Sequence, residues 1–480
     1  MQRYLRTLLL GLLTLLSSLS FAQESVIEAK SPDEKVLRGA LCLIKADQRL
    51  LLVDEIITNK LSLPGGTIST GEFPQLAAQR ETWEEAGLVV SVGKELGRTD
   101  SAIIYHCFSD SEIIAYNNSA NGRGNDLPIW FAPHYGVEVR GATLVNPYYI
   151  SKESYRYPAQ WQVIQELFEQ ATDQPVRYVD QLIEQAPPLR QLELNWIQSI
   201  QGVVLNSPNW LNDILVMTGK VIEVICHPIF LIMCISLIYW SFGKAVTLKL
   251  FFAVNATSLF VVVAQQGFSM PVPHAYMPML SFSNGQGFSF PDLYMANWIC
   301  FSCIFIRTVS PRHSIRFAVI SSTAALLLSF FMFVTGSAFI TDLIVGAILG
   351  ALVSWHFIRL DVSPLVGGED LFSRKRVWLG VILVTLVLLI VWPFPTFLYW
   401  LVASAAMLVN SVVWRNHSPN NQGKARVFSL VVVALVAALY IAIKSWLSFS
   451  GLGSIAVSVV AIFCLLVLPV SLAERWELKR

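Results

Sequence analysis

Long apolar runs fill the second half of this chain and leave few folds open to it. Nine such runs lie near residues 223–240, 247–268, 290–308, 317–334, 339–358, 378–393, 396–414, 427–446 and 454–472. A helix of about 20 residues crosses a bilayer core, where backbone groups find partners only inside helices or closed barrels. The runs therefore predict an all-α polytopic membrane domain of about nine transmembrane helices.

The residues before these runs have a different character. Hydrophobic residues make up 54% of the 480-residue chain and charged residues only 14%, yet charges are frequent between residues 23 and 200. That part is expected to fold as a domain in water. The formal net charge of +1 gives no basic excess of the kind that nucleic-acid binding requires, so no nucleic-acid partner is expected.

The first 22 residues predict a secretory signal peptide. Arg3 and Arg6 precede an apolar stretch at 8–16, and Ser20-Phe21-Ala22 resembles a cleavage site. An uncleaved N-terminal anchor is the alternative. Either segment would deliver the next domain outside the cytoplasm.

Basic residues between the apolar runs indicate the same orientation. Fifteen of them fall on one side: Lys244, Lys249, Arg307, Arg312, Arg316, Arg359, Arg374, Lys375, Arg376, Arg415, Lys424, Arg426, Arg475, Lys479 and Arg480. Lys444 alone lies near the other side. Because basic residues concentrate in cytoplasmic loops, we expect a multi-pass protein of a bacterial-type inner (plasma) membrane. Its water-soluble domain would lie on the periplasmic side and its C-terminus in the cytoplasm.

The cysteines fit that location. Cys42 and Cys107 fall in the water-soluble part and could pair in an oxidising compartment, whereas the other five lie in apolar runs. No spacing among them resembles a zinc site.

One stretch of the first domain, residues 65–88, concentrates acidic side chains: GGTISTGEFPQLAAQRETWEEAGL. Its composition predicts a helix over 74–86, after short β-forming runs and a Pro-Gly-Gly turn. At about 100° per residue, Glu81, Glu84 and Glu85 fall within one arc of the helix surface. Like charges this close repel each other, and a hard divalent cation such as Mg²⁺ or Mn²⁺ relieves the repulsion. A solvated acidic helix face is the alternative.

The same stretch resembles the signature of the Nudix hydrolases, G-x5-E-x7-R-E-U-x-E-E-x-G-U, in which U is a bulky aliphatic residue. The fixed positions are occupied by Gly66, Glu72, Arg80, Glu81, Glu84, Glu85, Gly87 and Leu88. Thr82 departs from the pattern, because it stands where the first aliphatic residue belongs. The resemblance covers roughly residues 35–170 and implies an α/β Nudix domain, an α/β/α sandwich with a mixed sheet.

The resemblance also implies roles for these residues. The carbonyl of Gly66 and the carboxylates of Glu81, Glu84 and Glu85 would hold Mg²⁺ or Mn²⁺. Together with Arg80, the three glutamates are the expected catalytic residues. Arg80 would also pair with Glu72, and Glu72 and Gly87 are expected to support the loop and helix structurally. The implied reaction is hydrolysis of a diphosphate linked to another group, by water positioned for in-line attack.

Residues outside the signature are expected to complete the site. Glu112 and Glu138 are the candidates for a catalytic base, although both also fit exposed strand carboxylates. In the loop NNSANGRGNDLPIWFAPHYG, four side chains could contact phosphate or a ring, and packing of the loop is the alternative: Arg123, Trp130, Phe131 and Tyr135.

The apolar runs resemble a second family, the type 2 phosphatidic acid phosphatases, membrane enzymes that dephosphorylate lipid phosphates and pyrophosphates. The segment LNSPNWLNDILVMTGKVIEVI is similar to the segment that leads into their helices. Their chemistry requires the motifs K-x6-R-P, P-S-G-H and S-R-x5-H-x3-D. One histidine attacks phosphorus and another protonates the leaving group.

The catalytic positions of that family are degenerate in this chain. The replacements are Gln265 for Lys, Val272 for Arg, Asp292 for Ser, Tyr294 for His, Phe331 and Met332 for Ser-Arg, and Ala338 for the attacking His. Asp342 alone remains, and neither His274 nor His227 stands at a matching place. Because a methyl group cannot act as a nucleophile, we expect a phosphatase-like but inactive membrane domain.

The chain is thus expected to divide into five parts: a signal peptide (1–22), a Nudix domain (23–175), a linker (176–204), a phosphatase-like membrane domain (205–360) and four further transmembrane helices (361–480). We expect an exported, membrane-tethered Nudix hydrolase that cleaves a small-molecule or lipid-linked diphosphate, with membrane lipids as its other partners. The alternatives are a bifunctional Nudix hydrolase and lipid phosphatase, and a non-catalytic sensor or scaffold that binds phosphorylated ligands.

Overall fold

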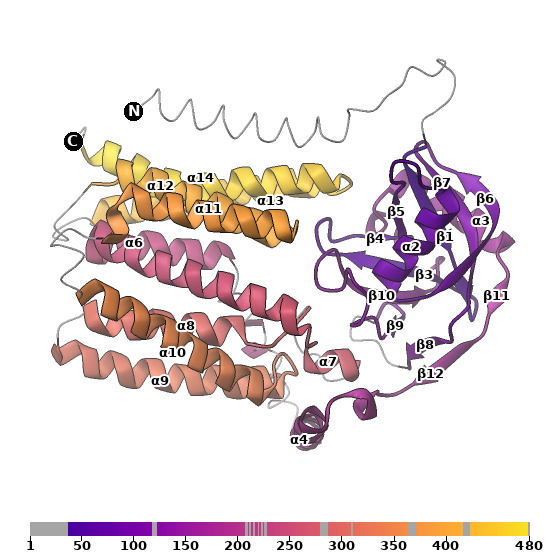
Figure 1. Cartoon of the computed structure of the whole chain (residues 1–480), viewed down its shortest axis with the longest axis horizontal. Coiled ribbons are helices and arrows are strands. Elements are labelled where there is room, and N and C mark those ends of the chain that lie inside the picture. The colour runs from indigo at the N-terminus through magenta and orange to yellow at the C-terminus, as the bar shows by residue number, and fades with distance from the viewer. Residues whose placement is uncertain are drawn as a thin grey trace, which may run out of the picture.

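The computed structural model describes residues 37–117, 122–206, 228–278, 287–308, 311–362, 371–415 and 423–478, with isolated positions between 210 and 224. A domain rich in strands lies at one end of a bundle of long helices (Figure 1). The predicted signal peptide and most of the segment predicted to lead into the membrane domain lie outside the described residues.

Two main sheets form the strand-rich domain. The first has the order β5-β1-β7-β6 and contains β1 (Gly39–Leu43), β5 (Gly65–Thr67), β6 (Val90–Arg98) and β7 (Ala102–Ser109). The second has the order β11-β2-β3-β10-β9, with β4 beside β3; its strands are β2 (Lys45–Ala46), β3 (Arg49–Glu55), β4 (Leu61–Ser62), β9 (Asn125–Leu127), β10 (Val139–Val145) and β11 (Asp173–Gln174). The first sheet is mixed, because β1 and β7 are parallel whereas β5 and β6 pair antiparallel to their neighbours.

Helices cover opposite faces of these sheets. Alternate side chains of a strand point to opposite faces. In β3, Leu51 and Val53 share a core with the alanines of α2 (Pro74–Ala86). Leu50 and Leu52 share the other core with Trp161 and its neighbours in α3 (Trp161–Gln170), which follows the short turns η1 (Lys152–Ser154) and η2 (Pro158–Gln160). The domain therefore has the predicted α/β architecture, with a helical layer on each side of the strands.

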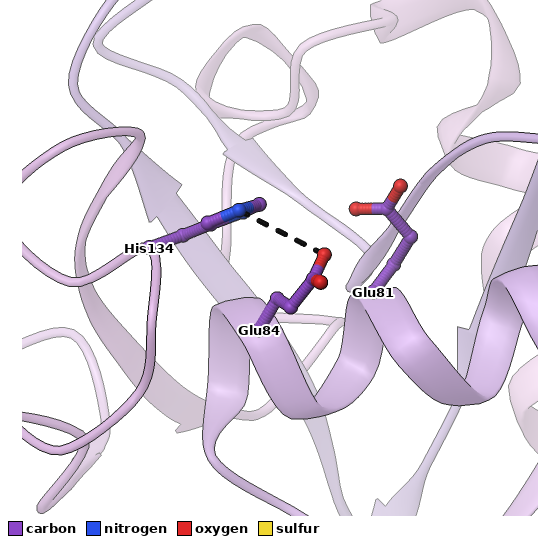
Figure 2. Close-up of side chains that lie close together, drawn as sticks. All are labelled: Glu81, Glu84 and His134. Carbon is purple, nitrogen blue, oxygen red and sulfur yellow. Dashed lines mark ion pairs between the residues drawn. The ribbon is translucent and has the colours of Figure 1, made fainter. Parts of the chain in front are cut away.

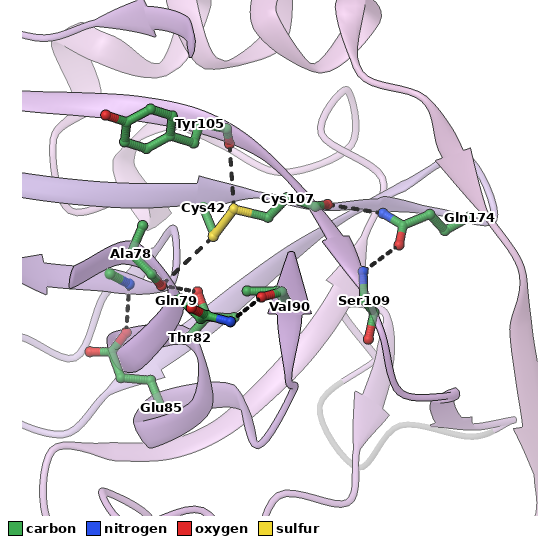
Figure 3. Close-up of a disulfide and its surroundings, with 11 residues drawn as sticks. Cys42, Ala78, Gln79, Thr82, Glu85, Val90, Tyr105, Cys107, Ser109 and Gln174 are labelled. Carbon is green, nitrogen blue, oxygen red and sulfur yellow. Dashed lines mark hydrogen bonds between the residues drawn. A yellow bond between two sulfur atoms is a disulfide. The ribbon is translucent and has the colours of Figure 1, made fainter. Parts of the chain in front are cut away.

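A disulfide joins the two parallel strands at the centre of the first sheet. Cys42 of β1 and Cys107 of β7 have Cα atoms 5.4 Å apart, and both side chains are fully buried. Figure 3 shows the bond next to Ala78 of α2. The bonded cysteines are 65 residues apart in the sequence, so the loop that they close contains the whole of α2.

The described elements of the C-terminal region are helices joined by short connections. Its elements are α6 (Pro228–Phe268), α7 (Pro273–Tyr276), α8 (Leu293–Thr308), α9 (Pro311–Val334), α10 (Ile340–Val362), η6 (Leu371–Ser373), α11 (Lys375–Val391), α12 (Pro395–Val413), α13 (Gly423–Trp446) and α14 (Gly451–Leu478). Helices lie at the nine predicted runs so far as the structure describes them. Two of those runs fall within α6, which Gly243 interrupts with a non-helical backbone (φ 84°, ψ 175°).

Six of the described helices are long and apolar enough to cross a membrane: those at Ile229–Phe268, His313–Val334, Ile340–Leu360, Pro395–Val413, Gly423–Trp446 and Gly451–Glu477. The number nine therefore stays a prediction. Large apolar side chains on the outside of the bundle are strongly exposed, such as Leu326 at 72%, Leu435 at 65% and Ile390 at 73%. A surface of this kind fits a lipid environment.

Residues 176–204, predicted to be a linker, form defined elements between the two parts. Strand β12 (Val176–Val179) pairs with β8 (Ile113–Tyr116), and η3 (Ile183–Gln185) leads into α4 (Pro188–Leu205). Leu194 and Ile197 of α4 are buried in a core shared with Phe339 of the bundle. The segment is therefore an interface as well as a connection.

Candidate metal centre

Helix α2 places three glutamates at the edge of the domain core. Its alanines at positions 77, 78 and 86 are buried against the sheets, and this packing carries Glu81 and Glu85 to only 8% exposure. Burial raises the pKa of both carboxyls, that of Glu85 well above its ordinary value. Glu84 lies on the same side of the helix and is half-buried. Gly87 ends the helix in the left-handed conformation, with φ 65°.

The glycine loop before α2 lies directly against these carboxylates. The N–H of Gly65 donates to Oε2 of Glu85 at 2.9 Å. A Cβ added to Gly66 would lie 2.5 Å from Cδ of Glu81, far inside van der Waals contact. Only glycine therefore lets β5 approach the Glu81 carboxylate this closely.

Arg80 ties the loop and the carboxylates together. Its Nε donates to Oε1 of Glu72 at 3.0 Å, and its Nη1 donates to both Glu81 and Glu84 at 2.9 Å. The hydrogen bond from Arg80 lowers the pKa of Glu72 to about 2. Glu72 also accepts from the N–H of Ser69 at 2.9 Å, which closes the turn before the helix. The predicted pairing of Arg80 with Glu72 is present.

His134 joins this cluster, although it lies outside the sequence motif and was not among the predicted site residues. Its backbone N–H donates to the carbonyl of Glu84 at 2.9 Å, and its Nε2 lies 3.7 Å from Oε2 of Glu84. Figure 2 shows the imidazole facing Glu84, with Glu81 on the next turn of the helix. Its Nδ1 is buried without a hydrogen-bond partner and lies 3.4 Å from Oε2 of Glu138. The only sequence signal was the presence of a histidine in the loop already expected to contact substrate.

The donor set fits a divalent cation. Glu81, Glu84 and His134 each offer one ligand atom, and these atoms all lie within 4.8 Å of one another. Arg80 supplies one positive charge against the carboxylates of Glu81 and Glu84, and the buried Glu85, which lies outside this set of three ligand atoms, is a third acid whose ionised form a cation would favour. Carboxylate oxygens at this density suit Mg²⁺ or Mn²⁺.

The remaining predicted residues fall in different places. Glu112 pairs with Arg177 at 3.0 Å on the exposed edge formed by β8 and β12, away from the cluster. Glu138 reaches the cluster through His134. Phe131 packs over the end of α2, where a Cβ on Gly87 would lie 2.8 Å from its ring.

The other loop residues are also placed. Arg123 lies close enough to Asp54 for its charge to lower the pKa of that carboxyl, although burial raises this pKa more. Trp130 and Tyr135 pack against residues of the helical bundle, Tyr276 and Phe288 respectively. The loop thus touches both parts of the protein.

The phosphatase-like positions do not form an open site. Asp342 is fully buried and accepts hydrogen bonds from Arg190 of α4 and, at 2.5 Å, from Ser289. Asp292 is buried and accepts from the N–H of Met295 at 2.6 Å. Tyr294 is 42% exposed, whereas Ala338 is fully buried.

A second acid belongs to the Asp342 network. Glu193 lies 3.5 Å from Arg190 and accepts from the N–H of Thr341 at 3.0 Å. Arg190 therefore faces two carboxylates, and its positive charge is fully balanced.

A sandwich whose glycine loop and following helix gather carboxylates beside an arginine–glutamate pair is the arrangement of a Nudix domain. Residues 35–134 match the family model described as the NUDIX domain. The chain therefore contains a Nudix domain in this range, followed by an apolar helical region.

Two individual proteins are similar to this part of the chain. A MutT-like protein from Streptomyces ambofaciens is 31% identical over 86 residues, which are 17% of this chain and 56% of that protein. The crystal structure of an ADP-ribose pyrophosphatase from Streptococcus suis is 16% identical, with a TM-score of 0.19; the match covers 29% of this chain and 97% of that one. The chain thus spans little more than half the length of the MutT-like relative.

Proposed function

We propose that this protein is a membrane-held Nudix hydrolase that cleaves a diphosphate linkage with Mg²⁺ or Mn²⁺. The observation that carries the proposal is the cluster of Glu81, Glu84 and His134, whose ligand atoms lie within 4.8 Å of one another inside the Nudix domain. Buried carboxylates with excess negative charge are unfavourable unless a cation compensates them.

Different residues of the site would bind the cation, orient its ligands and accept a proton. When bound, the cation supplies charge neutralisation for the phosphoryl oxygens and a more acidic water. Glu81, Glu84 and Glu85 would hold it together with the carbonyl of Gly66. Arg80 fixes the directions of the Glu81 and Glu84 carboxylates by its two hydrogen bonds. His134, held through its backbone to Glu84, would offer Nε2 to the same cation, while its Nδ1 faces Glu138, our candidate base.

We also propose that the domain lies outside the cytoplasm. The buried disulfide supports this location, because such bonds persist in oxidising compartments. The one-sided distribution of basic residues in the loops supports it independently. The helical region would then be a multi-pass anchor with its C-terminus in the cytoplasm.

Phosphatase activity of the helical region forms no part of the proposal. Asp342 would have to orient a nucleophile, but Arg190 and Ser289 already occupy its carboxylate. Two acids also balance the charge of Arg190, so the arginine offers no attraction to a phosphate group. Ala338 supplies no nucleophile.

The test is turnover by the full-length protein in detergent or nanodiscs. Nucleotide and isoprenoid diphosphates are supplied with Mg²⁺ or Mn²⁺, and phosphate and nucleotide products are measured. We expect turnover that disappears with chelator and falls at least 100-fold in Glu84→Gln. Glu166→Gln, which changes an exposed acid on α3, is the matched control and should keep wild-type activity. A folded protein that binds metal without turning over any diphosphate would instead be a sensor.

A further inference from the structure

Two separate contacts hold the Nudix domain against the end of the helical bundle. Arg156 donates from Nε to the carbonyl of Phe449, between α13 and α14, at 3.2 Å. On another part of the domain, Gly136 and Gly287 touch so closely that a Cβ on Gly136 would lie 2.7 Å from the Cα of Gly287. Figure 1 shows the same end of the bundle facing the domain.

In both contacts, the residue from the Nudix domain lies close to residues that surround the metal centre. Arg156 also pairs with Glu55 at 2.9 Å, and Gly136 belongs to the turn that starts at His134. Glu85 interacts electrostatically with Glu55 and with Glu138, the partner of His134. The metal centre is therefore placed at the bundle by the residues that build it.

A row of aromatic rings runs from the metal helix to the bundle. Trp83, next to Glu84 in α2, lies 6.1 Å from Phe131, and Phe131 lies 6.1 Å from Trp130. Trp130 then lies 4.8 Å from Tyr276 of α7, at the end of the bundle. We call these four residues the aromatic row. Its first two rings are open, since Trp83 is 39% and Phe131 53% exposed, whereas Tyr276 at its far end is buried.

The far end of the aromatic row is held firmly. Tyr116 donates to the carbonyl of Ala275 at 2.7 Å, and the rings of Tyr135 and Phe288 lie 5.8 Å apart. The domain is therefore held against α7 and the segment that follows it by more than the aromatic row alone. At the start of α2, two further apolar side chains are exposed: Phe73, the residue before the helix, at 70% and Leu76 at 53%.

We propose that the substrate of the metal centre is an amphiphile: a diphosphate attached to a hydrocarbon chain that lies against Trp83 and Phe131, the exposed rings of the aromatic row. This inference rests on the proposed hydrolase function and names its substrate class. A nucleobase covers one ring, whereas Trp83 and Phe131 present two exposed rings in succession, and the row continues from them to α7 at the end of the bundle. Burial of a hydrocarbon chain would also cover the exposed rings beside the charged cluster.

Hydrolysis of such a substrate forms one P–O bond and breaks another. The oxygen of water bonds to one phosphorus, and the bond between that same phosphorus and the oxygen that bridges it to the second phosphorus breaks. The bridging oxygen leaves with that second phosphate, and the protons of water pass to solvent and to the products. For a terminal prenyl diphosphate, the products are the prenyl monophosphate and orthophosphate.

The experiment compares prenyl diphosphates of 5, 10 and 15 carbons, which share one headgroup, and ADP-ribose as a soluble diphosphate. Full-length protein in phosphatidylcholine nanodiscs hydrolyses each with Mg²⁺ or Mn²⁺, and kcat/KM is measured from product release. We expect kcat/KM to rise at least tenfold from the 5-carbon to the 15-carbon substrate and to exceed that for ADP-ribose.

The Phe131→Ser variant distinguishes contact of the hydrocarbon chain with the protein from partition of the substrate into the bilayer. Partition of the substrate is the same for the wild type and the variant. The substitution should lower kcat/KM for the 15-carbon substrate at least fivefold and that for the 5-carbon substrate less than twofold. Tyr149→Ala, which removes a ring that is 89% exposed elsewhere on the domain, should change neither.

The possible failures are distinguishable. Equal kcat/KM for all chain lengths, with activity still dependent on Glu84, would overturn the amphiphile and leave the hydrolase. Preference for ADP-ribose would assign the rings to a nucleobase and overturn the amphiphile as well. Absence of turnover on every diphosphate would overturn both proposals.

Discussion

Removal of the Cys42–Cys107 disulfide should weaken the Nudix domain by a predictable amount. A bond that closes a loop of 65 residues removes chain entropy from the unfolded state. The chain-entropy relation gives about 4 kcal/mol for that length. Both cysteines are fully buried beneath α2, so the strands that support the metal helix would lose this stabilisation directly.

Hydrogen exchange of β1 and β7 in the full-length protein measures the effect. Each 1.4 kcal/mol changes the equilibrium constant for unfolding tenfold. Exchange of the most protected amides should therefore accelerate about 1,000-fold in the Cys42→Ala/Cys107→Ala variant. Reductant should have a similar effect on the wild type and none on the variant. That second comparison isolates the bond from the change in side chains.

Two results would contradict this expected effect of the disulfide. Exchange rates in the double variant within tenfold of the wild type would mean that the bond constrains an unfolded state that is already compact. Acceleration in the helices of the bundle, without acceleration in β1 and β7, would mean that the disulfide acts through the interface instead.

Three further changes test the site and the interface. Gly66→Ala should lower kcat/KM at least 100-fold, because the new Cβ would overlap the Glu81 carboxylate; near-normal kinetics would refute the close approach. The pKa of Glu72 is lowered to about 2 from an ordinary 4.5, so its pairing stabilises the domain above pH 4.5 and is lost as the pH falls toward 2. Denaturation across that range should show a loss of about 1 kcal/mol for this exposed pair, absent in Glu72→Gln; parallel curves would contradict it. Arg190→Met should destabilise the protein by about 3 kcal/mol by leaving Asp342 buried and unpaired, and Arg190→Met/Asp342→Asn should recover most of that in thermal melts; no recovery would show that packing, not charge, is lost.

The part of the site that lies on one loop and one helix was predictable from the sequence. Arg80, Glu81 and Glu84 are related by helical spacing, and Glu72 lies one loop earlier, so their order in the chain nearly determines their geometry. His134 lies about fifty residues beyond Glu84, and only the folding of a long loop brings the two together. No local pattern encodes such a meeting.

The helical half shows the same division. Apolar runs predicted where the helices lie, because a helix that crosses a bilayer needs about 20 apolar residues within its own sequence. They did not predict that α4, in a polar segment with prolines, would dock on the bundle. Asp342 looked like a remnant of a catalytic motif, whereas its partner Arg190 is 152 residues earlier in the chain. Buried charges in one half of a chain can thus be explained only with the residues of the other half.

The two anchors of the Nudix domain also set an order of events during synthesis. Arg156 leaves the ribosome 293 residues before its partner Phe449, a delay of about 15–60 s at ordinary rates of translation. Gly136 meets Gly287 sooner, after 151 residues. The domain is therefore complete before either anchor exists, and it docks on the bundle in two stages, first through the loop that contains Gly287 and last through the turn between α13 and α14.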